Sequence, residues 1–127
     1  MKTILMLLCS LFCVEIYATL PVYSDVRAYV EKHNPNDQTP ATNRIFMAFE
    51  WSDSAIMQYH DGMKLDDVIK QSKFKGRDVF IFVFRGESDG KPGTPVYDSR
   101  FTKIKSSEFV VLPFDAIHLV DIRTPIN

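Results

Sequence analysis

Cysteine is nearly absent from this 127-residue chain, and both of its cysteines lie close to the N-terminus. Cys9 and Cys13 fall within an apolar segment, and no cysteine follows position 13. The rest of the chain therefore cannot form a disulfide, a zinc–thiolate site or a cysteine nucleophile. Its stability must come from packing, although small exported domains commonly rely on disulfides.

The sequence also lacks an excess of either charge. Its 15 Lys and Arg residues and 16 Asp and Glu residues leave a formal net charge of −1. Without a basic cluster, we do not expect nucleic acid or an anionic membrane surface to be the main partner. There is no Gly-X-Ser-X-Gly motif, and no glycine-rich phosphate loop follows a strand. The sequence therefore predicts no metal site and no cofactor.

The longest apolar run lies at the N-terminus and is too short to span a membrane. Lys2 precedes the apolar residues 3–14, and the small residue Ala18 closes the segment. This order is typical of a secretory signal peptide. We therefore expect cleavage after Ala18, with residues 1–18 removed and residues 19–127 exported as a single domain.

A second apolar run, between Asp78 and Arg85, indicates the interior of the fold. Its six residues at 79–84 read Val-Phe-Ile-Phe-Val-Phe. This composition is typical of a strand that is buried on both faces. Because side chains alternate along a strand, the three phenylalanines would face one covering layer, and the three aliphatic residues would face the other.

Weaker patterns surround this strand. They predict helices over residues 24–33, 52–60 and 65–72, and further strands over residues 44–51, 95–101, 108–114 and 116–122. Helices early in the chain and consecutive strands late in it are typical of the α+β class. We predict a mixed or antiparallel sheet of about five strands with two or three helices packed on it. A helix between the first two strands would make those strands parallel.

The strand over residues 95–101 begins with a proline, which predicts a place at the edge of the sheet. An exposed edge can pair with another chain. The segment Val96–Phe101 therefore offers a route to a homodimer.

Two short segments resemble the ADP-ribosyltransferase family. Phe84-Arg85-Gly86-Glu87 is similar to the strand end that carries that family's arginine, and Ser107–Pro113 is similar to its glutamate strand. The resemblance implies that Arg85 would hold the pyrophosphate of NAD and that Glu108 would stabilise the ribose cation. The Ser-Thr-Ser motif of that family is absent. One alternative function is therefore an ADP-ribosyltransferase-like enzyme.

A third segment, Phe49–Ala55, resembles the strand-to-helix active-site turn of thioredoxin, and Gly93–Val96 resembles the proline loop of that family. The two catalytic cysteines would fall at Ser52 and Ala55. The resemblance therefore implies the fold without thiol chemistry, and a second alternative is an inactive thioredoxin-like domain.

The leading prediction is a small exported domain that acts by binding a protein or a small molecule. Loops that a rigid sheet positions commonly carry function. This favours the loop at 86–94 and the turn at 51–53 as contact surfaces. The candidate ligand-binding residues are Trp51, Asp53, Arg85, Glu87 and Glu108.

Overall fold

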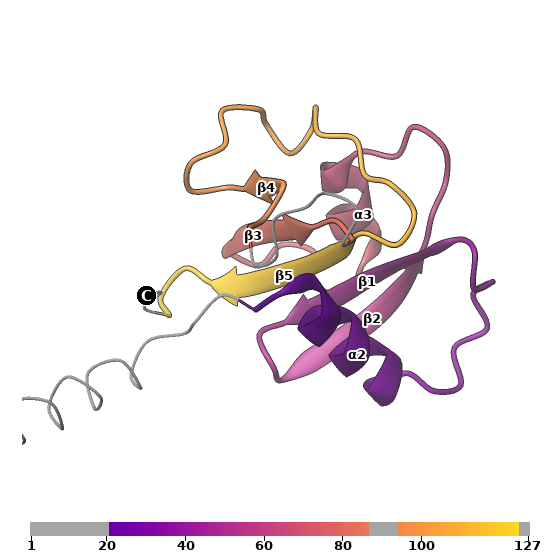
Figure 1. The fold of residues 1–127 in the computed structure, drawn as a ribbon. Coiled ribbons are helices and arrows are strands. Elements are labelled where there is room, and N and C mark those ends of the chain that lie inside the picture. Colours follow the sequence, from indigo (N-terminus) through magenta and orange to yellow (C-terminus); the bar gives the residue numbers. More distant parts are fainter. Residues whose placement is uncertain (1–20, 87–93, 125–127) are drawn as a thin grey trace, which may run out of the picture.

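A computed structural model of the chain describes residues 21–86 and 94–124 (Figure 1). The predicted signal peptide, Glu87 and most of the 86–94 loop lie outside the described residues. The elements along the chain are α2 (Tyr23–His33), β1 (Arg44–Phe49), β2 (Asp53–Gln58), α3 (Leu65–Gln71), β3 (Val79–Phe84), β4 (Tyr97–Asp98) and β5 (Ala116–Asp121). The fold is a single α+β domain, as the sequence predicts.

The five strands form one mixed sheet in the order β2-β1-β5-β3-β4. The β1–β2, β3–β5 and β3–β4 pairs are antiparallel, whereas β1 and β5 are parallel. β1 and β5 are neighbours in the sheet although β2, α3, β3 and β4 lie between them in the sequence. The two edges of the sheet are β2 and β4.

One helix packs on each face of the sheet. Val26 and Val30 of α2 are fully buried against one face, in a cluster that includes Phe46 and Phe82. Leu65 and Val68 of α3 are fully buried in the cluster on the other face. Figure 1 shows α2 lying over β1 and β2, well away from α3. The sheet therefore separates two hydrophobic layers.

The apolar run at 79–84 forms β3, as predicted, and its side chains divide between the two layers. Phe82 and Phe84 belong to the cluster under α2, and Val83 belongs to the cluster under α3. These three residues are buried, whereas residues 79–81 are half-buried. The difference follows from the position of β3 next to the short edge strand β4, which covers only its C-terminal half. Burial on both faces is thus confirmed for the second half of the run.

The helix predicted over residues 52–60 is wrong. Asp53–Gln58 is instead strand β2, which forms an antiparallel hairpin with β1. The apolar residues of this segment fit a helical face, but β1 leaves a row of unpaired backbone groups that the next segment can satisfy. Pairing with β1 therefore overrides the local pattern. The predicted parallel arrangement of the strands at 44–51 and 79–84 is also wrong, because β5 lies between β1 and β3 and is parallel to β1 but antiparallel to β3.

Residues 108–114 are not a strand either. They contribute one isolated bridge, between Val110 and Lys64, and otherwise form a loop that runs from the α3 side to the α2 side, where Leu112 and Phe114 lie beside α2. Val111 from this loop is fully buried and donates its backbone N–H to the carbonyl oxygen of Met63 at 3.0 Å. The apolar run therefore closes the core under α3 without joining the sheet.

Candidate functional site

The turn between β1 and β2 presents Trp51 at the end of the hairpin. Glu50, the first residue of the turn, has a left-handed backbone (φ 49°), a conformation that side chains other than glycine adopt at a cost. Its N–H donates to the carbonyl oxygen of Leu119 at 2.8 Å, and its carboxylate accepts a hydrogen bond from the Thr124 hydroxyl at 2.7 Å. The turn is therefore tied to β5 and to the residues after it, and Trp51 has a fixed place.

The indole ring of Trp51 is half exposed and is held by two neighbouring rings. Trp51 as a whole is 48% exposed. The ring meets Tyr29 of α2 edge-on, with centroids 5.1 Å apart, and lies 5.2 Å from the His118 ring of β5. Tyr29 in turn packs against the ring of the exposed His33, with ring centroids 4.2 Å apart. We call the outer surface formed by Tyr29, His33 and Trp51 the hairpin surface.

His118 lies beneath the hairpin surface in the middle of the sheet. It is opposite Ala48 of β1 and Phe82 of β3, and it is only 3% exposed. Its Nδ1 atom has no hydrogen-bond partner among the described residues. Burial lowers the pKa of the His118 imidazole from 6.5 to about 4, because the charged form would lose its hydration. The ring under Trp51 is therefore neutral at pH 7.

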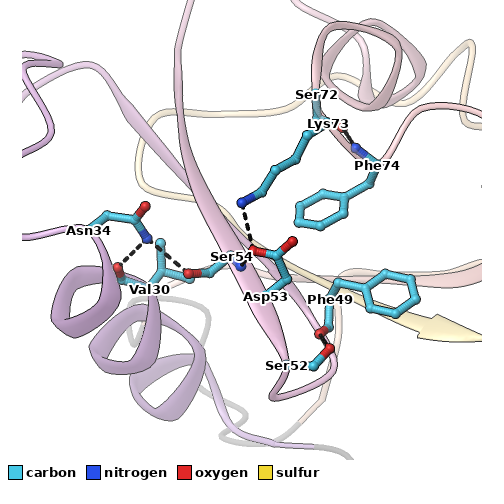
Figure 2. Close-up of polar contacts among 9 residues, drawn as sticks. All are labelled: Val30, Asn34, Phe49, Ser52, Asp53, Ser54, Ser72, Lys73 and Phe74. Carbon is cyan, nitrogen blue, oxygen red and sulfur yellow. Dashed lines mark hydrogen bonds and ion pairs between the residues drawn. The ribbon is translucent and has the colours of Figure 1, made fainter.

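Asp53 belongs to the same hairpin but points to the opposite face of the sheet. Figure 2 shows its carboxylate meeting Lys73, which follows α3; the Nζ and Oδ1 atoms are 2.6 Å apart. This hydrogen bond lowers the pKa of the Asp53 carboxyl below its ordinary value. On the other side of β2 in the same view, the Asn34 amide donates to the Ser54 hydroxyl. Trp51 and Asp53 thus lie at one end of the sheet without sharing a surface.

Arg85 lies at the other end of the sheet from the hairpin. It follows Phe84, which pairs with Ala116 at the start of β5, whereas Trp51 follows Phe49, which pairs with Leu119 near its end. The loop after Arg85 and the turn at Trp51 were both predicted as contact surfaces. The parallel pairing of β1 with β5, together with the antiparallel course of β3, places Arg85 and Trp51 at opposite ends of the sheet.

The guanidinium group of Arg85 is held by Asp115, which is fully buried. Both carboxylate oxygens of Asp115 accept hydrogen bonds from Arg85, from Nε and Nη2, each at 3.0 Å. Asp115 also accepts the backbone N–H of Leu112 at 2.8 Å, and Arg85 donates to the carbonyl oxygen of Val110 at 3.3 Å. This arrangement fixes the loop before β5 against the end of β3, which is a structural role for Arg85.

Arg85 also lines an open hollow of about 770 Å³ beside α2, together with Arg27, Leu112 and Phe114. Glu108 is exposed and is not among the described residues that line this hollow. Of the two residues that the resemblance to ADP-ribosyltransferases pairs, Arg85 lines this hollow and Glu108 does not. Glu87 lies outside the described residues.

Within residues 21–86 and 94–124, no group of three or more His, Cys, Asp or Glu side chains gathers where it could hold a metal ion. Neither helix in this part of the chain has the length and apolar character that crossing a bilayer requires.

Sequence reasoning found Trp51 but missed Tyr29 and His118, which hold it. In the sequence, Tyr29 fits the apolar stripe of a helix, and His118 fits an ordinary strand position.

Comparisons with protein-family models, with curated proteins and with solved structures find no match to this chain.

Proposed function

We propose that this chain is an exported binding domain without disulfides and that it recognises a protein partner through the hairpin surface of Tyr29, His33 and Trp51. Export is supported by the signal-like sequence of residues 1–18. Binding is supported by one observation above all: a tryptophan that is half exposed while its inner side is fixed by two rings.

The physical reason is that binding free energy concentrates in a few rigid aromatic anchors. Tryptophan and tyrosine are enriched among such residues, because they offer a large contact area and lose little conformational freedom on binding. Trp51 has already lost that freedom, since Tyr29 and His118 constrain its indole and the Glu50 hydrogen bonds constrain its backbone. The exposed half of the ring is therefore preorganised for contact.

The test is capture of a partner from the fluid into which the protein is exported, with the Trp51→Ala variant as the comparison. Truncating an anchor of this kind costs about 2 kcal/mol or more, so the affinity should fall by about thirtyfold or more. The matched control is Phe101→Ala, which removes a 76% exposed aromatic residue on the loop after β4. This control should bind as the unmodified chain does.

Circular dichroism must show that both variants are folded, because Trp51 also covers part of the core. If Trp51→Ala is folded and captures the partner with unchanged affinity, the hairpin surface is not the contact surface. If Phe101→Ala loses binding and Trp51→Ala does not, the contact lies on the loop after β4.

A further inference from the structure

The two edges of the sheet differ in whether their backbone groups are satisfied. At β4, the Asp98 N–H donates to the Thr102 hydroxyl at 2.9 Å. The Asp98 carbonyl oxygen accepts the N–H groups of Phe101 at 3.0 Å and Thr102 at 2.7 Å. The turn after β4 therefore closes this edge. The homodimer predicted through Val96–Phe101 would have to break these bonds.

At the other edge strand, β2, the hydrogen bonds show which backbone N–H and C=O groups point away from the sheet. The Tyr59 N–H donates to the carbonyl oxygen of Asn43 at 2.7 Å, which makes these two residues a hydrogen-bonded pair. Antiparallel ladders alternate between hydrogen-bonded and non-hydrogen-bonded pairs. Ala55 and Met57 therefore bond to β1, and the backbone groups of Ser54, Ile56 and Gln58 point away from the sheet.

Most of these outward groups have no partner. The Ser54 N–H donates to the Asp53 carboxylate at 2.8 Å. The N–H and C=O groups of Ile56 and Gln58 have no hydrogen-bond partner among the described residues. The strand also contains no proline and no lysine, two residues that commonly protect an edge from pairing.

We propose that β2 pairs with β2 of a second copy of this chain, antiparallel and with Ile56 opposite Ile56. Each Ile56 then exchanges hydrogen bonds with the other Ile56, and each Gln58 N–H donates to the Ser54 carbonyl oxygen of the other copy. This register matches all three outward-directed residues of the strand with their counterparts. The two sheets join into one continuous sheet across a two-fold axis.

The side chains are compatible with this register. Ala55 falls opposite Met57 of the other copy, and Asp53 falls opposite Tyr59, so no like charges meet across the two strands. The two-fold axis runs perpendicular to the sheet, which keeps the α2 helices of both copies on the same face. A shift by one residue is excluded, because it would place Ile56 opposite Ala55 or Met57 of the other copy, whose backbone groups already bond to β1.

Sedimentation of the purified protein from about 1 µM to about 1 mM should show a monomer–dimer equilibrium. Gln58→Pro removes an outward N–H and places a ring in the path of the second strand, while every bond from β2 to β1 is kept. The dissociation constant should rise by about tenfold or more, because hydrogen bonds are lost at both ends of the pairing. Gln58→Ala loses the same exposed side chain but keeps the N–H, so it should associate as the unmodified chain does.

Hydrogen exchange shows where the copies meet and keeps the proposal testable if Gln58→Pro does not fold. The Ile56 and Gln58 amides should exchange more slowly as the protein concentration rises, and the Asp98 amide should not change. A monomer at every concentration, a dimer that leaves the Ile56 amide unprotected, or a folded Gln58→Pro variant that associates normally would each overturn this pairing. Self-association should survive in Trp51→Ala, so a failure of this proposal is distinguishable from a failure of the proposed function.

Discussion

Replacing Asp115 with asparagine should lower the free energy of unfolding by about 3 kcal/mol. Asp115 is fully buried and holds the Arg85 guanidinium through both of its oxygens. The substitution keeps the shape but removes the charge, and it turns one of the two acceptors into a donor that faces the guanidinium N–H groups. Urea unfolding followed by circular dichroism measures the change.

The matched control is Glu31→Gln, which removes the carboxylate of an exposed ion pair. Arg27 and Glu31 form a 2.9 Å contact one helical turn apart, and their side chains are 41% and 44% exposed. Water screens such a pair, so the loss should stay below about 0.5 kcal/mol. Equal effects of the two substitutions would contradict the structural role assigned to the Arg85–Asp115 pair.

The second large effect concerns pH. We expect the free energy of unfolding to fall by about 3 kcal/mol between pH 6.5 and pH 4, because of His118 alone. The pKa of this buried imidazole is lowered to about 4 in the folded chain, whereas it is 6.5 when exposed. As pH falls through this window, the unfolded chain binds the proton and the folded chain does not. The stabilisation is complete above pH 6.5 and is lost as pH falls towards 4.

His118→Phe should remove this slope, because the replacement fills a similar volume with a ring that does not titrate. His60→Gln, a substitution at an exposed position, should leave the slope unchanged. Unfolding at several pH values between 4 and 7 provides the comparison. A slope that persists in His118→Phe would show that another group causes it.

Much of the fold follows from local sequence. β3 was predictable because a short run of Val, Ile and Phe between charges has few other stable places than a covered strand. The weaker pattern at 116–122 predicted a strand, which is β5 (Ala116–Asp121), and α3 appears at 65–71, within one residue of its expected end. α2 covers Tyr23–His33 and begins one residue before the predicted start at residue 24. These elements are decided by composition and by helix-end signals that lie within a few residues.

The elements that were mispredicted depend on distant neighbours. Residues 53–58 form a strand because β1 is adjacent and needs a partner on that side. Residues 108–114 lie outside the sheet, because their backbone bonds to residues 63–65, at the start of α3. The proline before β4 correctly predicted an edge strand, but the local patterns did not predict which strands would be neighbours.

In the candidate site, too, some features follow from local sequence and others depend on distant neighbours. The sequence places Trp51 in a turn, which the structure confirms. The face of the sheet on which Trp51 or Asp53 lies depends on the pairing register of β1 and β2. The partner of Arg85 is thirty residues away, and the rings around Trp51 come from a helix and from the middle of the sheet. Such contacts become visible only when the strand order is known.

The hairpin surface can be observed directly, because Trp51 is the only tryptophan of the chain. Incorporation of 5-fluorotryptophan gives the chain a single fluorine resonance, and a captured partner adds none. We predict that this resonance shifts or broadens in proportion to the complex formed as the partner is added. A resonance that stays unchanged while size-exclusion chromatography shows the complex would contradict the assignment of Trp51 to the contact surface.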